Sequence, residues 1–210
     1  MDPSAHRSRR RLLIALGGAS TLALGTGCGL GNAPRRDFHL LRDADSQAGA
    51  PAGPAIDKVL LVSSGAMPGL YDSDRMVFSA DGRSRSYFQF GNWSERPAQS
   101  LQGLAETRLA RSKRFREVVS STSGVRGDLL LTLRLDELYL DASAAPGQVR
   151  LIVTADLIDW RNRQLLARRS FAQAAAVANS DAGGLADAAS QAVAVVLGEL
   201  VTWAASSAAG

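Results

Sequence analysis

The sequence predicts an α/β (α+β-like) fold, a single domain in which a mixed, largely antiparallel sheet is covered by two amphipathic helices. Three observations lead to this prediction. Long segments of alternating apolar and polar residues follow one another in the middle of the chain, two other segments carry apolar residues at helical spacing, and the order of elements is strands, helix, strands, helix. No composition break divides residues 58–205, so we expect one domain there.

The first strands are predicted from short apolar runs and from the turns between them. Residues 37–41 form an early strand and the apolar run 58–63 a buried one. Residues 75–79 and 85–90 alternate around the dipeptide Asp81-Gly82, which is a hairpin signal. We therefore expect an antiparallel pair at this point of the chain.

The strongest strand signal lies in residues 128–141. Its leucines occupy every second position and then shift by one residue; they are Leu129, Leu131, Leu133 and Leu135, followed by Leu138 and Leu140. A slip of this kind is what a β-bulge produces. Residues 148–160 alternate again after a turn, and residues 165–177 follow as a third strand of the same antiparallel meander.

Two helices are predicted. The first covers residues 97–112, with Ser94 as its N-cap and Pro97 in the first turn, where a missing N–H costs nothing. The second begins near Asp181 and carries an apolar stripe from Leu185 to Trp203.

The N-terminus has the pattern of an export signal. Arg7, Arg9, Arg10 and Arg11 precede the apolar run 12–24, which is well short of the roughly 20 residues that a membrane-spanning helix needs. The run ends in Gly25-Thr26-Gly27-Cys28, which resembles the lipobox of bacterial lipoproteins, although Gly25 stands where that pattern prefers an aliphatic residue. The alternative is an ordinary secretory signal with a coincidental cysteine. The arginines also resemble a twin-arginine signal, so Sec and Tat export both stay open.

This interpretation divides the chain into a signal peptide at residues 1–27, a lipidated tether at 28–36 and a domain at 37–210. The resemblance implies that Cys28, the only cysteine, is acylated and holds the domain on a membrane. Removing the signal takes away four of the 24 Lys and Arg and one of the 20 Asp and Glu, which leaves a nearly neutral protein. A nucleic-acid partner is therefore not indicated.

The residues that catalysis or metal binding would need are scarce. One cysteine and two histidines cannot build a four-ligand Cys/His zinc site, and His39 has no nucleophile placed beside it by any motif. The acidic pairs Asp136/Glu137 and Asp156/Asp159 fit solvent-facing strand positions better than a catalytic pair. We expect no enzyme activity, no metal and no cofactor.

An aromatic cluster precedes the first helix and allows two interpretations. The first is core packing at the helix entry; the second is an apolar groove for an acyl chain or a partner peptide. Arginines flank the cluster, and Arg residues together with aromatic ones are enriched at interfaces. The candidate partner or ligand surface consists of Arg75, Arg85, Tyr87 and Trp93.

Several of these features occur together in one known family. The lipobox cysteine is followed by Phe38-His39-Leu40-Leu41, Val59-Leu60-Leu61-Val62, Asp74-Arg75-Met76-Val77-Phe78 and Asn92-Trp93-Ser94-Glu95-Arg96-Pro97. This order resembles the ABC-type transport auxiliary lipoprotein family, in which a Tyr precedes a Trp-x-Glu-x-Pro helix start; Tyr87, Trp93, Glu95 and Pro97 match. The resemblance covers most of residues 38–205.

The resemblance implies an auxiliary lipoprotein whose partner is an MCE-domain (mammalian-cell-entry-like) protein of an ABC transporter for lipids or other hydrophobic molecules. It transfers no catalytic residues, and it leaves homo-oligomer formation open. The domain would face the periplasm, and Gly29, in place of the Asp that favours inner-membrane retention, points to the outer membrane. The alternative is an independent lipid-binding or outer-membrane assembly lipoprotein; a lipid-anchored hydrolase ranks last because no nucleophile is evident.

Overall fold

The computed structural model describes residues 35–47 and 53–209, and every element below lies in the compact unit Arg36–Gly210. The elements in chain order are β1 (Asp37–His39), β2 (Ile56–Ser64), β3 (Arg75–Ser79), β4 (Ser86–Trp93), α1 (Pro97–Ser112), β5 (Phe115–Ser120), β6 (Leu129–Asp141), β7 (Gln148–Asp159), β8 (Gln164–Ala176) and α2 (Ala182–Ala209). The signal, the tether and Cys28 lie outside the described residues.

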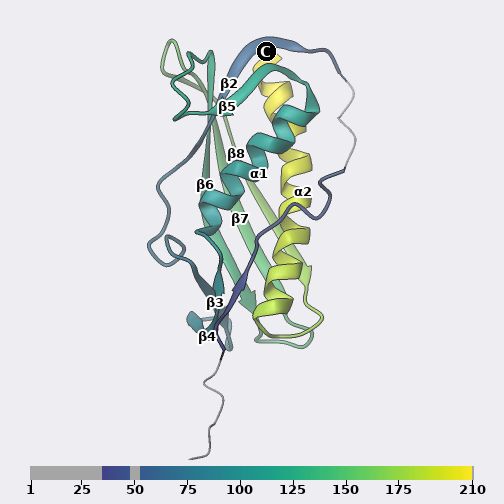
Figure 1. The fold of residues 1–210 in the computed structure, drawn as a ribbon. Helices are drawn as coiled ribbons and strands as arrows, with labels where there is room; N and C mark the ends of the chain where they lie inside the picture. Colours follow the sequence, from purple (N-terminus) through teal and green to yellow (C-terminus); the bar gives the residue numbers. More distant parts are fainter. Residues whose placement is uncertain (1–34, 48–52, 210) are drawn as a thin grey trace, which may run out of the picture. The chain divides into compact units, whose positions relative to one another are not determined.

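Strand β6 organises the sheet (Figure 1). One of its edges pairs along its whole length with β7, which in turn pairs with β8. Its other edge is shared: residues 129–133 pair with β2, which carries β5, and residues 140–141 pair with β3, which carries β4 and β1. The two ends of β6 therefore support two different groups of strands.

The sheet is mixed, and the prediction that it is largely antiparallel is wrong. Among the described strands four of the seven pairings are parallel, namely β1–β4, β2–β5, β2–β6 and β3–β6. The antiparallel pairings are the hairpins β3–β4, β6–β7 and β7–β8. Alternation and turn residues mark hairpins in a sequence, whereas parallel partners are joined by long connections that leave no local mark.

The predicted bulge in β6 is confirmed. The register between β6 and β7 shifts between Leu135 and Glu137, so Asp136 is the extra residue. The shift keeps the leucines on both sides of it on the helix-facing side of the sheet, opposite the fully buried Leu151 and Val153 of β7.

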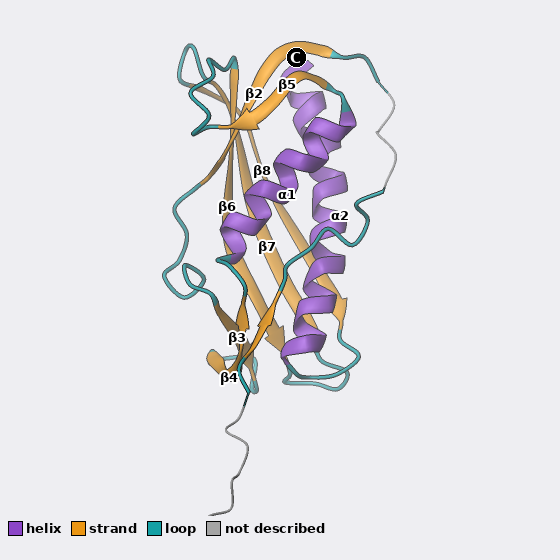
Figure 2. Cartoon of the chain, viewed as in Figure 1, coloured by secondary structure: helices purple, strands orange, loops and turns teal. Residues whose placement is uncertain are grey.

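Both helices cover the same face of the sheet (Figure 2). Helix α2 packs on β7 and β8, α1 packs on β5, β2 and β6, and the two helices contact each other. Leu109 of α1 and Leu200 of α2 are buried in the resulting core. The predicted architecture of one sheet covered by two helices is therefore correct.

Helix α1 has the predicted bounds but not the predicted cap. Its N-cap is Arg96, which makes no side-chain capping bond, and Pro97 occupies the first helical position. The backbone N–H of Ser94 instead donates to the carbonyl of His39 at 2.8 Å, joining β1 to the helix entry. Helix α2 does use the residue expected near its start, since Oδ1 of Asp181 accepts the Gly184 N–H at 2.7 Å.

Helix α2 is also the one described helix that is long and apolar enough to cross a bilayer. An 18-residue stretch of its 28 residues has a mean hydropathy of 1.6, and 56% of that stretch is buried within the domain. Packing against the sheet and α1 accounts for its composition.

Candidate partner-binding surface

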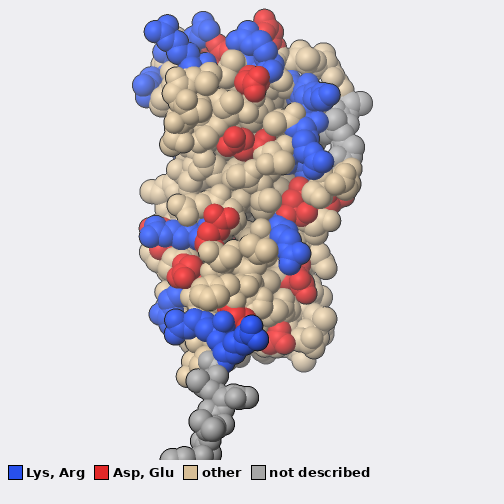
Figure 3. Space-filling view, in the orientation of Figure 1, with Lys and Arg blue, Asp and Glu red and all other residues tan. Residues whose placement is uncertain are grey.

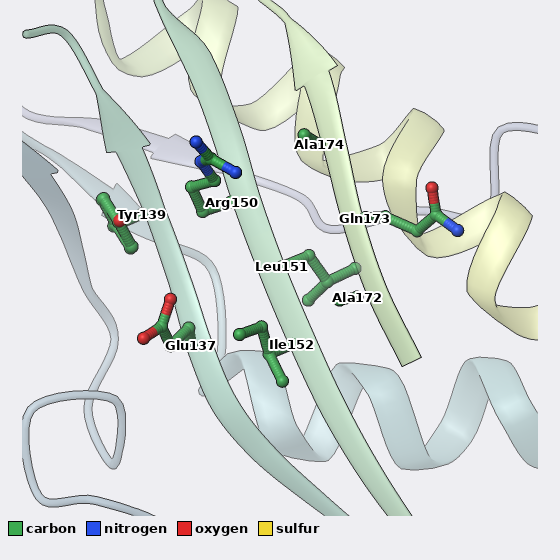
Figure 4. Close-up of a pocket in the computed structure, with 8 residues that line it drawn as sticks. All are labelled: Glu137, Tyr139, Arg150, Leu151, Ile152, Ala172, Gln173 and Ala174. Carbon is green, nitrogen blue, oxygen red and sulfur yellow. The ribbon is translucent and has the colours of Figure 1, made fainter. Parts of the chain in front are cut away.

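The strands β6, β7 and β8 turn a second face away from the helices. Side chains alternate across a strand, so β7 directs Arg150 and Ile152 to this side and Leu151 into the core. Cross-strand pairing places Tyr139 and Ala174 beside Arg150, and Glu137 and Ala172 beside Ile152. These residues line a hollow of about 250 Å³ (Figure 4). We call this region the open face.

An arginine stacked on a buried tyrosine borders the open face. The guanidinium of Arg85 lies 3.6 Å from the ring centre of Tyr139 and donates a hydrogen bond to Tyr71 of the β2–β3 loop. Both tyrosines are buried, and burial raises the pKa of each phenol above its usual range. Arg85 is thus held between a ring and a hydroxyl that stay neutral at physiological pH.

A second stack lies on the β3–β4 hairpin, where the guanidinium of Arg75 is 3.6 Å from the ring centre of Tyr87. In the hairpin turn that follows β3, the N–H groups of Ser84 and Arg83 donate to Asp81 and lower its pKa to about 2. Each stack fixes a long cationic side chain on a flat ring, which reduces the entropy lost when a partner binds.

The structure places the four residues proposed from the sequence in two different environments. Arg75, Arg85 and Tyr87 lie at or near the surface, but Trp93 is only 2% exposed and belongs to the core. Trp93 is therefore not part of a partner surface, and the first interpretation of the aromatic cluster, core packing at the helix entry, is correct for it. Its backbone N–H donates to Asp74, which fixes the end of β4 directly before α1.

Sequence reasoning missed a second hollow, at the end of the sheet where β6 begins. It measures about 610 Å³ and is lined by Arg116, Val125, Arg126, Gly127, Asp128, Trp160 and Arg161. Asp128 organises it by accepting the Val59 N–H at 2.8 Å and ion-pairing with Arg116 and Arg161. The arginines are far apart in the sequence, so no local motif could have revealed the cluster.

In the described part of the chain, the acidic side chains that the sequence offers as possible catalytic pairs have structural roles. Asp156 accepts two hydrogen bonds from Arg168, which hold its pKa below the usual range. Asp136 accepts from Arg134 and Thr154, and Asp159 accepts backbone N–H groups of the β7–β8 turn. Within residues 35–47 and 53–209 no three His, Cys, Asp or Glu side chains gather to hold a metal.

Comparison with known proteins gives a family and a fold. Residues 39–201 match the family described as ABC-type transport auxiliary lipoprotein component. Among curated proteins, none matches the chain.

The crystal structure of protein XCC0632 from Xanthomonas campestris is similar, with a TM-score of 0.74 at 20% identity over 81% of this chain and 95% of that one. An uncharacterized protein has a TM-score of 0.61 at 14% identity over 80% and 99% of the two chains. Identities this low establish the shared fold alone. The PelC dodecamer from Paraburkholderia phytofirmans, with a TM-score of 0.45 at 17% identity over 70% and 92%, is too distant to support an argument about assembly.

Proposed function

Because this chain belongs to the family of ABC-type transport auxiliary lipoprotein components, we propose that it is the membrane-anchored auxiliary subunit of an MCE-type ABC system that moves lipids or other hydrophobic molecules across the envelope. In this proposal Cys28 carries the acyl chains, the outer membrane holds them, and the domain faces the periplasm. It binds a partner and has no turnover of its own. The family match over residues 39–201 is the observation that carries the proposal.

The open face and its arginine–tyrosine stacks are the surface we propose for the partner. Interface hot spots are enriched in Arg and Tyr, and here two arginines are already ordered on tyrosine rings. Arg150 adds a third guanidinium on the same side of the sheet. A partner presenting carboxylates beside an apolar side chain would complement the three arginines and Ile152.

The test is capture of a named partner by the full lipoprotein. The MCE-domain chain encoded beside this gene should copurify with the acylated protein after cross-linking in cells. Arg85→Glu combined with Arg150→Glu should lower the capture at least tenfold, because each change places a carboxylate opposite the partner's carboxylates.

The matched control is Arg163→Glu. Arg163 is also an exposed arginine stacked on an aromatic ring, 3.9 Å from the centre of Trp160, but it lies in the β7–β8 turn. This control should leave capture unchanged. Equal losses in both variants would place the contact elsewhere. Failure to recover any MCE chain, together with stoichiometric lipid in the isolated protein, would favour an independent lipid-binding lipoprotein.

A further inference from the structure

Exposed apolar side chains gather where the described domain begins. Seven large apolar residues are notably exposed in the described part of the chain, and three of them lie on or next to the β1–β4 pair: Phe38 at 63%, Leu40 at 54% and Phe90 at 40%. In the parallel register Phe38 lies opposite Asn92, two residues after Phe90. Among the described strands β1 pairs only with β4, so no described strand pairs with its outer edge. We call these three side chains the edge patch.

The covalent connection to Cys28 limits where a membrane could meet this domain. The chain from Cys28 to Asp37 spans at most about 30 Å when fully extended, at about 3.3–3.6 Å per residue. Strand β6 has 13 residues and is therefore about 40 Å long. Its last residues pair with β3, beside β4 and β1, whereas its first residues lie by the hollow around Asp128.

The described domain therefore begins at the edge patch, and the stretch from Cys28 to Asp37 reaches less far than β6 is long. To bring the opposite end of β6 to the same membrane, the chain would have to run back along the full sheet, farther than it reaches. The end with β1, β3 and β4 is the one that an anchor at Cys28 holds near the lipid.

Arginine side chains lie beside the apolar residues of the edge patch. Figure 3 shows Lys and Arg together with Asp and Glu at the lower end of the view, where Figure 1 places β3 and β4, and a comparable group of Lys and Arg at the upper end. Arg75 and Arg85 stack on tyrosine rings and belong to the surface proposed for the partner, so the arginines of β1, β3, β4 and their immediate flanks that are left for lipid headgroups are Arg36 and Arg83. Exposed Phe and Leu flanked by Arg is the composition with which proteins enter the boundary between headgroups and acyl chains.

We propose that the edge patch seats the domain on the bilayer that holds Cys28, with Phe38, Leu40 and Phe90 in the headgroup boundary. This inference rests on the acylation at Cys28 in the proposed function. The seat adds a second attachment to the acyl chains and fixes which end of the domain points away from the membrane.

The experiment uses the full acylated protein in vesicles of phosphatidylethanolamine and phosphatidylglycerol at about three to one. Since acylation consumes the only native cysteine thiol, the variants Phe38→Cys and Leu165→Cys each carry one thiol for a fluorophore. Leu165 is the matched control because it is 53% exposed and is the second residue of β8, at the end of the sheet with the opposite hollow. Lipids with brominated acyl chains then report contact by quenching.

Quenching at position 38 should exceed quenching at position 165 severalfold. A further Phe90→Ser change should at least halve the quenching at position 38, whereas Leu166→Ser should not alter it. Equal quenching at both positions overturns the inference, as does a fluorescence blue shift at position 38 without quenching, which would indicate a second copy or another protein on the patch.

Flotation of the vesicles separates this inference from the proposed function. Protein that does not float with the vesicles overturns the acylation and the seat together. Protein that floats without preferential quenching overturns the seat alone. Capture of the MCE chain through the open face is measured independently of both.

Discussion

A buried ion pair fastens the start of the domain to its helices, and breaking it should destabilise the fold strongly. Asp43 follows β1 and accepts two hydrogen bonds from Arg108 of α1, at 2.7 Å to Nε and 2.6 Å to Nη2. The two side chains are 7% and 9% exposed. On the other side of Asp43, the Arg42 N–H donates to the Ser190 hydroxyl of α2 at 3.1 Å. The segment that continues from the tether is thus tied to both helices.

The variant Arg108→Met tests this fastening. It keeps the length of the side chain but leaves the Asp43 carboxylate buried without its cation, which costs about 3–5 kcal/mol. Domains of this kind have a total unfolding free energy of about 5–15 kcal/mol, so the variant should lose a third or more of its stability. In urea the midpoint should fall while the slope m stays constant.

Two further variants make the test decisive. Arg96→Met removes a partner from the Arg96–Asp72 pair, whose side chains are about half exposed, and should cost at most about 1 kcal/mol. Adding Asp43→Leu to Arg108→Met removes both charges and should restore most of the lost stability. A loss below about 1 kcal/mol in Arg108→Met, or a double variant no better than the single one, would refute the reasoning.

Three other perturbations have defined outcomes. Gly184→Ala should destabilise the domain by more than about 1 kcal/mol in urea unfolding, because the new Cβ would lie 2.0 Å from a backbone oxygen. Gly198→Ala in the same helix meets no atom within 4 Å and should stabilise the domain by up to about 1 kcal/mol. The pKa of Asp128 is lowered, chiefly by the hydrogen bond from the Val59 N–H. Its contribution to the unfolding free energy is therefore present above the unfolded pKa of about 3.9 and is lost as pH falls towards the folded pKa. Asp128→Asn should make the unfolding free energy fall less steeply below about pH 4, and an unchanged pH dependence would contradict this. Cys28→Ser should abolish the diacylglycerol mass and the membrane attachment, and a wild-type protein that lacks this mass would show that the lipobox interpretation is wrong.

The elements that local patterns specify could be predicted, and the pairings that span the chain could not. Both helices, the β6–β8 meander and the bulge at Asp136 follow from periodicity within short windows. Strand β5 was missed because its six residues follow α1 after a two-residue turn and show little alternation of buried and exposed positions. Its partner β2 lies more than fifty residues earlier, so only the folded sheet reveals the parallel pair.

The candidate surface shows the same division. Arg85 and Tyr87 were found because they lie in one aromatic segment, but the ring on which Arg85 stacks belongs to Tyr139 of β6. The parallel pairing of β3 with the end of β6 brings them together, and no turn signal announces that pairing. Trp93 was misplaced because composition cannot distinguish an exposed aromatic ring from one that is buried in the folded core.

In these proposals the seat and the Asp43–Arg108 pair both help to hold the open face in a fixed orientation. An acyl anchor raises the local concentration of the domain but does not by itself fix its orientation, and a partner must then overcome that rotational entropy. Seating the edge patch on lipid removes most of this freedom before the partner arrives. The seat can orient the domain only if the segment after β1 is rigidly joined to the helices, and Asp43 provides that junction through α1 while the neighbouring backbone bonds to α2. Loss of the junction should therefore weaken capture of the MCE chain even at temperatures where the domain remains folded.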